Sequence, residues 1–354
     1  MLPEIDTEGA TLPFRSGRNA KAVGPFHIAS EEAQCGVRLR HVGSMRFAWH
    51  GCLWGHRPTG EQSLAAVPPG HVYVAQGSDV TSKVYRYSLR PDGLPSTLPD
   101  GELTLGFPFP AGIAIGPEGD LYVSSAGNGN ACDHTCFVAV FVPGASGSAK
   151  PIRVLDIPQG PLFIAIDQRG YLDVHSYKTG YLLTDVYAPN ASGHDPPINE
   201  FKTTGVNALA ASHGLVYIQT SESWVQSAGE HSTGRGVRYY RYPYYSANGV
   251  AIDGRQLYAE VYYPVRRSLY LGTEVFDLDQ PSAPLRLIVG GGCHELASGG
   301  ALGYGVAVFK RYLFESCIDG QPAGLVQVYD ATKSGLQQPI RTLHGGLAGI
   351  AIGP

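Results

Sequence analysis

The chain has 354 residues, and its 46 glycines and 26 prolines exceed average usage, which predicts many turns. Only 16% of the residues are charged and the formal net charge is −4, so the concentrated basic surface that a nucleic-acid partner requires is not expected. A hydrophobic content of 43% excludes a disordered chain, and no apolar run approaches the roughly 18 residues of a membrane span. The composition therefore favours a turn-rich all-β protein.

A hairpin-like unit recurs along the chain. From Ala111 the sequence reads AGIAIGPEGDLYVSSAG, in which an apolar run, a turn and a second alternating run predict two antiparallel strands. Similar units start at Leu162, Asn207, Asn248 and Tyr304. A third run and a Pro-rich fourth run follow most of them, as in FVAVFVPGASGSAKPIRVL from Phe137. Four strands in a repeat of about 40 to 56 residues predict one blade of a β-propeller.

The two ends of the chain predict the number of blades. Residues 348–354 read AGIAIGP and form a first strand without a partner, whereas the run HVYVAQGSD from His71 is a second strand without a first. Pairing of these two runs closes the ring and leaves no unpaired edge. The sequence therefore predicts an all-β, six-bladed β-propeller over residues 67–354. Residues 1–66 do not fit the repeat, and we expect an N-terminal extension that packs on the propeller.

The recurring hairpin resembles that of the six-bladed propellers of the NHL and SMP-30 (gluconolactonase-like) type, in which G-[IV]-A-[IVL]-x-x-x-G-x-[LV]-Y-V-A-[DE] returns in each blade. The resemblance covers roughly residues 70–354. Proteins of this type include lactonases, phosphotriesterases, lyases, peptide-amidating enzymes and binding modules. The resemblance therefore implies the architecture and a site at the central channel, and it leaves the chemistry open.

Six cysteines occur in the chain, and their positions suggest pairs. If strand one of a blade runs away from a face and strand two returns to it, Cys293 and Cys317 lie at the same end of one hairpin, within reach of a disulfide. The short loop with Cys132, His134 and Cys136 could alternatively hold zinc. The expected disulfides join Cys132 with Cys136, Cys293 with Cys317, and Cys35 with Cys52. Disulfides imply an oxidising compartment, so we expect a secreted or periplasmic protein, although no signal peptide is recognised at the start of this sequence.

Two rings of residues are expected around the mouth of the channel, where the start of strand one meets the end of strand two. The first ring contains Ala111, Leu162, Asn207, Asn248, Tyr304 and Ala348. The second ring contains Ala75, Ser124, His175, Gln219, Glu260 and Glu315. Polar side chains gather in the last three blades, with His175 as an exception among the others. A ring that only packs could repeat one small residue, so this polar sector is the candidate site.

The polar sector predicts a divalent metal site. Its oxygen donors, a set that suits Ca²⁺, are Asn207, Asn248, Glu260 and Glu315. The resemblance implies such a site too, because SMP-30-like proteins hold a divalent cation with a Glu, two Asn and an Asp, and the Asn positions match Asn248 and Asn207. Tyr304 and Ala348 stand at the other two places, so Glu260 and Glu315 would supply the charge in a different geometry. Alternatively, these two carboxylates accept hydrogen bonds from loop amides.

Three functions follow from this site. The first is a secreted metal-dependent hydrolase of a lactone, ester or phosphotriester, in which His175, Glu260 or Glu315 moves the proton. The second, less favoured, is a polysaccharide or ester lyase with a His or Tyr base. The third is a non-catalytic propeller that binds a glycan or peptide. The ligand is a small molecule or carbohydrate, and its expected contacts are Gln219, Tyr245, His294 and Tyr304. The tyrosines could instead pack between blades.

Overall fold

The computed structural model describes residues 70–354 apart from several short segments. These segments are 78–81, 128–135, 179–180, 204, 222–223, 230–237, 242–243, 266–267, 281, 295–304, 318–323 and 347–348. The expected extension over residues 1–66 lies outside the described residues, and so do Cys35, Cys52, Cys132, His134, Tyr304 and Ala348. Several strand residues have described backbones only, among them Tyr245 in one strand and Cys293 and His294 in another.

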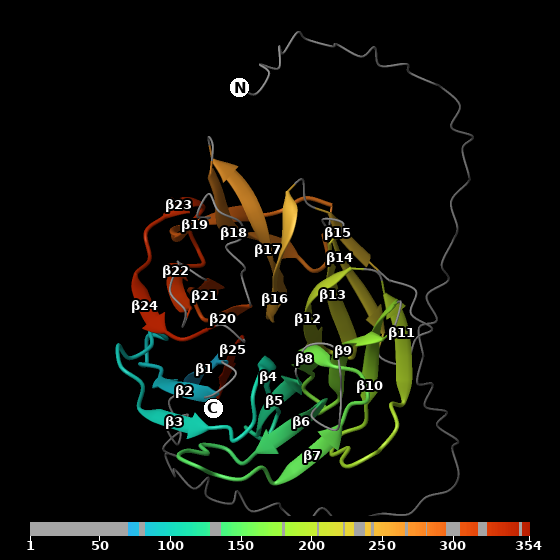
Figure 1. The fold of residues 1–354 in the computed structure, drawn as a ribbon. Helices are drawn as coiled ribbons and strands as arrows, with labels where there is room; N and C mark the ends of the chain where they lie inside the picture. Colours follow the sequence, from blue (N-terminus) through green and yellow to red (C-terminus); the bar gives the residue numbers. More distant parts are fainter. Residues whose placement is uncertain are drawn as a thin grey trace, which may run out of the picture. The chain divides into compact units, whose positions relative to one another are not determined.

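Six sheets are arranged in a ring around a common centre (Figure 1). Blade 1 contains β1 (His71–Gln76), β2 (Lys83–Ser88), β3 (Gly101–Thr104) and β25 (Ile350–Gly353). Blade 2 contains β4 (Pro110–Ile115), β5 (Leu121–Ala126), β6 (Cys136–Phe141) and β7 (Arg153–Asp156). Blade 3 contains β8 (Pro161–Ile166), β9 (Leu172–Lys178), β10 (Tyr181–Tyr187) and β11 (Asn199–Thr203).

The second half of the ring has the same plan. Blade 4 contains β12 (Val206–Ser212), β13 (Leu215–Thr220), β14 (Trp224–Gly229) and β15 (Arg238–Arg241). Blade 5 contains β16 (Tyr245–Asp253), β17 (Gln256–Val265), β18 (Ser268–Asp277) and β19 (Arg286–His294), with the short β23 (Gly335–Gln337) beside β19. Blade 6 contains β20 (Val306–Phe309), β21 (Tyr312–Cys317), β22 (Leu325–Asp330) and β24 (Arg341–His344). The predicted all-β, six-bladed propeller is confirmed.

The C-terminal strand closes the ring as predicted. In blade 1, β25 is the innermost strand and pairs antiparallel with β1, from His71 opposite Gly353 to Val74 opposite Ile350. The amide of Ala75 adds a hydrogen bond of 3.1 Å to the Gly349 carbonyl. Figure 1 shows this strand, coloured red, beside the blue β1. The first blade is therefore built from both ends of the described chain, and no edge strand is left open at the centre.

The innermost hairpins are specified by local sequence. Between β4 and β5, Gly119 has φ +87°, a left-handed conformation that glycine adopts without a steric penalty. The turn is closed by hydrogen bonds from the Gly116 amide to the Asp120 carbonyl (2.8 Å) and from the Gly119 amide to the Gly116 carbonyl (2.9 Å). Blade 3 repeats the arrangement with Gly170 at φ +85°. Such turns fix the register of the two strands, so the side chains near the channel are placed reproducibly.

The hydrophobic core lies between neighbouring sheets. One cluster joins blades 6 and 1 and includes Tyr87, Phe314 and Val326, which are all fully buried. The Tyr87 hydroxyl donates a hydrogen bond of 3.0 Å to the His344 carbonyl of blade 6. Truncation of a buried aromatic side chain typically costs about 3–5 kcal/mol of stability. Each blade therefore depends on both of its neighbours.

Outer strands are also tied to the next blade. Leu103 of β3 forms a parallel bridge with Gly147, and Leu155 of β7 forms one with Gly193. The equivalent segment between β22 and β24 of blade 6 is β23, which pairs in parallel with β19 of blade 5. These contacts account for the Ser-Gly pairs that recur between the third and fourth strands in the sequence.

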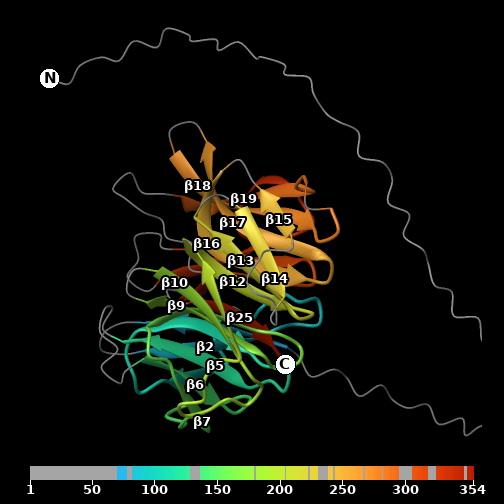
Figure 2. The same ribbon diagram turned by 90° about the vertical axis from the view of Figure 1, so that its right-hand side faces the viewer.

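Blade 5 differs from the others in the length of its strands. Its four main strands have nine or ten residues, whereas the strands of the other blades have four to seven. In Figure 2 the β17 and β18 ribbon extends past the sheets beside it. No helix with the length and apolar character needed to cross a membrane occurs in the described part of the chain.

Candidate functional site

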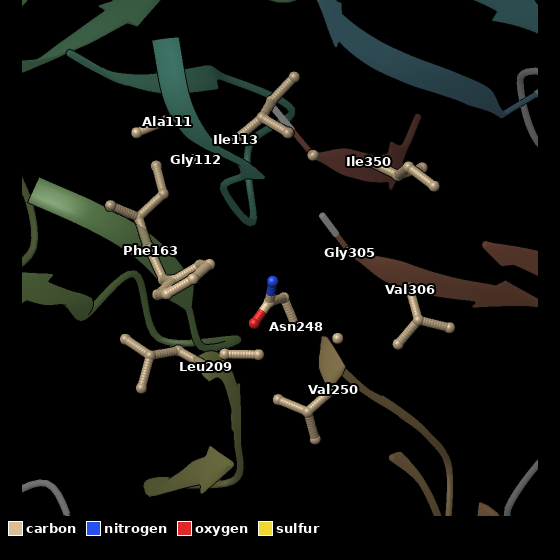
Figure 3. Close-up of a pocket in the computed structure, with 14 residues that line it drawn as sticks. Ala111, Gly112, Ile113, Phe163, Leu209, Asn248, Val250, Gly305, Val306 and Ile350 are labelled. Carbon is tan, nitrogen blue, oxygen red and sulfur yellow. The ribbon is translucent and has the colours of Figure 1, made fainter. Parts of the chain in front are cut away.

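The first strands of all six blades enclose a cavity at the centre of the ring (Figure 3). Its volume is about 90 Å³, room for a few water molecules or one small organic group, since a single water needs roughly 10–15 Å³. The wall consists mostly of glycine and aliphatic residues. Phe163 and Asn248 point into the space (Figure 3), and Asn248 is the one polar side chain among the described residues of the wall. The cavity is therefore a small apolar chamber with a single amide.

The first of the two predicted rings is only partly in the cavity wall. Ala111 and Asn248 line the cavity as expected. In blade 4, Ala208 lines it in place of Asn207, because the pairing of β12 with β13 is irregular between Val206 and Ala208. Asn207 therefore does not line the cavity, and its predicted role as a metal ligand stays a prediction.

The second predicted ring lies behind the wall. Its six members are all 0% exposed and none lines the cavity: Ala75, Ser124, His175, Gln219, Glu260 and Glu315. In a β-sheet the side chains stand perpendicular to the sheet, so residues of the second strand point toward the neighbouring blade. The first strand separates them from the channel. The expectation that these polar groups line the channel mouth is therefore wrong, although their proposed roles are not tested by this placement.

Two members of the second ring hold the backbone of Asn248 in place. Glu260 Oε2 accepts a hydrogen bond of 3.2 Å from the Asn248 amide, and Gln219 Oε1 accepts one of 3.1 Å from the Gly249 amide. Gln219 Nε2 donates a bond of 2.6 Å to the Glu260 carbonyl, which joins blades 4 and 5. A Cβ atom on Gly249 would lie 2.9 Å from Glu260 Oε2, so only glycine fits between this carboxyl and the cavity. Glu260 and Gln219 thus act as positioning residues for Asn248.

Glu260 and Glu315 form a buried acidic pair across blades 5 and 6. Glu315 Oε1 accepts a hydrogen bond of 2.5 Å from the Thr273 hydroxyl, while Glu315 Oε2 and Glu260 Oε1 have no partner among the described residues. Burial raises the pKa of Glu315 to about 7, against the opposing effect of the Thr273 bond. Burial, followed by the charge of Glu315, raises the pKa of Glu260 well above its ordinary value. Around neutral pH the pair therefore retains at least one proton.

His175 does not behave as the sequence suggested. Its ring stacks on that of Phe163, with the centroids 6.1 Å apart and the planes at 22°. Burial lowers the pKa of His175 to about 4, although a hydrogen bond to the Leu183 backbone opposes the shift. The expectation of titration near neutrality is wrong, because the neighbouring blade and Phe163 exclude water from the imidazole.

The tyrosines near the start of blade 5 separate into two kinds. Tyr240 is fully buried and its hydroxyl donates a bond of 3.2 Å to the Leu278 carbonyl, so it packs between blades. Tyr244 is half-buried and stacks edge-on against Tyr263 at a centroid distance of 4.8 Å. The predicted substrate contacts Tyr245, His294 and Tyr304 have no described side chains and stay predictions, whereas Gln219 has the positioning role given above.

Sequence reasoning missed Phe163 and Leu209 as residues of the cavity wall. The repeat pointed to Leu162 and Asn207, each of which precedes a lining residue. In blade 3 the pairing of β8 with β9 shifts between Pro161 and Phe163, and such an irregularity changes which side chain faces the centre. The Pro at the start of the strand is the one local signal of this shift, because proline cannot donate to the ladder.

Metal ligands and cysteines are described only in part. In the portion of the chain that the structure describes, no group of three or more His, Cys, Asp or Glu side chains is arranged to hold a metal ion. Cys136 and Cys317 are buried and disulfide-bonded. Because Cys132 and the side chain of Cys293 lie outside the described residues, the predicted pairing stays a prediction.

The sheets and the cavity define a six-bladed β-propeller with a chamber of about 90 Å³ in its channel. No family model matches the chain, and no curated protein matches it. Three solved structures are similar to it. The WD40 propeller domain of Doa1 has 11% identity and a TM-score of 0.42, and the match covers 68% of this chain and 70% of that chain. A protein of unknown function from Bacteroides caccae has 10% identity and a TM-score of 0.48, with coverage of 80% and 99%, and BamB from Moraxella catarrhalis has 11% identity and a TM-score of 0.40, with coverage of 77% and 70%. Identities this low concern the fold alone, which the sheet topology already establishes.

Proposed function

We propose that the cavity at Asn248 binds a small lactone, ester or phosphotriester and that the protein hydrolyses it. The observation that carries the proposal is one amide side chain in an otherwise apolar wall, on a backbone fixed by Glu260 and Gln219. A preorganised amide N–H can donate to an ester or phosphoryl oxygen and stabilise the charge that develops there. A chamber of about 90 Å³ favours a small substrate over a polysaccharide, glycan or peptide.

Glu260 is the proposed proton-transferring group nearest to this amide. Carboxyls with pKa values raised to the neutral range or above can exchange protons at neutral pH, and pairs whose values are pushed apart suit acid and base roles. Gly249 leaves only backbone between Glu260 and the cavity. Glu315 would tune the proton affinity of Glu260 through its charge. Access of water to the pair then requires a small movement of the Asn248–Gly249 backbone.

A divalent cation, expected to be Ca²⁺, suits the unpartnered oxygens of this pair. Glu260 Oε1 and Glu315 Oε2 are buried without a hydrogen-bond partner among the described residues, and carboxylate oxygens are the hard donors that calcium prefers. In this proposal Glu260, Glu315 and Asn248 hold the ion, with Asn207 as the fourth predicted ligand. When bound, the ion would polarise the substrate oxygen and lower the pKa of an attached water.

Replacement of Asn248 by alanine should lower kcat/KM by roughly 10²-fold or more, because the donor to the developing charge is removed. The measurement is the initial rate of hydrolysis of p-nitrophenyl acetate and γ-butyrolactone, with and without EDTA. Asn199→Ala on the outer strand β11 is the matched control and should retain the wild-type rate. Equal rates in Asn248→Ala and the wild type would contradict the proposal.

A non-catalytic propeller is the second candidate, because His175, Glu260 and Glu315 are all fully buried. In that case small esters bind to the wild type and not to Asn248→Ala, while no hydrolysis occurs in either protein. Calorimetric titration with the same two compounds separates this result from the first.

We also propose that the protein works in an oxidising compartment, secreted or periplasmic, because Cys136 and Cys317 are disulfide-bonded. Protein made in such a compartment should contain the pairs Cys132 with Cys136, Cys293 with Cys317, and Cys35 with Cys52. Mass spectrometry of unreduced peptides checks the pairing. Six free thiols would contradict both the pairs and the location.

A further inference from the structure

Phe163 occupies an unusual position in the cavity wall. Its ring points into the cavity (Figure 3), and it is the one aromatic side chain among the described lining residues. Directly opposite it in the ladder stands His175, which is fully buried and does not reach the cavity. The two rings are stacked. The phenyl ring therefore stands between the imidazole and the cavity.

The other blades have smaller residues at the equivalent place. The residues of the first strand that face the second ring are Gly112, Ala208, Gly249, Val306 and Gly349. A large aromatic ring occurs only in blade 3, where the residue behind it is His175 rather than a carboxylic acid, an amide or a small residue. Blade 3 is therefore the one blade in which a large side chain of the cavity wall covers an imidazole.

The imidazole has one nitrogen without a partner. Its Nδ1 lies 3.5 Å from the Thr184 hydroxyl, whereas Nε2 has no partner among the described residues. With its proton on Nδ1, a neutral imidazole presents a lone pair on Nε2. A buried acceptor without a partner is costly, so a donor that reaches it gains a favourable bond.

We propose that Phe163 is a specificity-determining residue of the channel: displacement of its ring opens a second subsite in which His175 Nε2 accepts a hydrogen bond from a hydroxyl group of the ligand. The ligand that fits has an apolar, preferably aromatic, part that takes the space of the phenyl ring and one hydroxyl that reaches the imidazole. The inference rests on the proposed function in one respect, namely that the channel cavity is where ligands bind.

The test uses the full chain with Phe163→Ala and the probe pair phenol and toluene, which have similar size and differ in a hydroxyl against a methyl group. We expect the variant to bind phenol at least about tenfold more tightly than toluene, the factor that one hydrogen bond to a buried acceptor provides. Calorimetric titration gives both affinities. NMR titration of the imidazole provides a second readout, because the pKa of His175, lowered to about 4 by burial, should rise when water replaces the phenyl ring.

Two controls separate the subsite from a merely larger cavity. Ile113→Ala widens the same cavity from blade 2, where Ile113 packs in the core cluster that blades 1 and 2 share, and should show no preference for phenol. The double variant Phe163→Ala with His175→Ala should lose the preference. Phe163→Leu, which removes less volume, provides the same comparison if the alanine variant unfolds. Equal affinities for the two probes, or a preference that persists in the double variant, would overturn the inference. No readout involves ester hydrolysis, so failure here is distinguishable from failure of the proposed function.

Discussion

Removal of residues 349–354 should prevent the propeller from folding stably. The truncation deletes β25, so β1 loses its inner partner and the ladder that joins the two ends of the ring. Ile350 and Ala351 are each 8% exposed, and Ile350 belongs to the core cluster shared by blades 6 and 1. Loss of one buried isoleucine alone costs about 2–5 kcal/mol, and a whole domain is stable by only about 5–15 kcal/mol.

Urea unfolding followed by circular dichroism checks this expectation. The truncated chain should have no cooperative transition, or one at a much lower urea concentration than the full chain. Deletion of the exposed Pro354 alone is the matched control and should leave the midpoint nearly unchanged. A truncated chain with the midpoint of the full chain would mean that closure by β25 does not stabilise the ring.

Glu315→Gln should change the pH dependence of stability. The pKa of Glu315 is about 7 in the folded protein against an ordinary value of 4.5, so the folded state binds this proton more tightly than the unfolded state. The resulting stabilisation is complete below about pH 4.5 and is lost as the pH rises through about 7. The wild type should therefore lose on the order of 3 kcal/mol over this interval through this group, while the glutamine variant should not.

Equilibrium unfolding between pH 4.5 and 8 in the presence of EDTA measures the difference. Glu118→Gln, at an exposed turn position between β4 and β5, is the control and should follow the wild type. Added Ca²⁺ should reduce the loss in the wild type, since the ionised Glu260 and Glu315 then have a partner. Parallel curves for Glu315→Gln and the wild type would show that this carboxyl is not held in the protonated form by burial.

The architecture could be predicted from the sequence because its determinants are local or lie at the chain ends. Turn glycines such as Gly119 and Gly170 mark most of the inner hairpins, and alternating apolar runs identify the strands on either side. The unpaired runs at His71 and Ile350 predicted that the ring closes by pairing of the two chain ends. The number of blades followed from counting the recurring hairpin units.

The site could be predicted only in part because it depends on the packing of one blade against the next. Position along the strand correctly placed Asn248 in the cavity wall, yet it did not show that the neighbouring blade covers Glu260 and Glu315. His175 was expected to face the channel, but a second-strand side chain points between blades. Phe163 was missed because an irregular pairing at the start of β8 moves the wall by one residue.

The central claim, that the channel cavity is the ligand site, is tested most directly by filling it. Ala111→Phe places a ring in a cavity of about 90 Å³ and leaves Asn248, Glu260 and Glu315 unsubstituted. The measurement is the dissociation constant for γ-butyrolactone of this variant beside that of the wild type, after equal unfolding midpoints have been verified. We expect binding in the wild type and at least about tenfold weaker binding in the variant. Unchanged affinity in a folded Ala111→Phe protein would contradict the account.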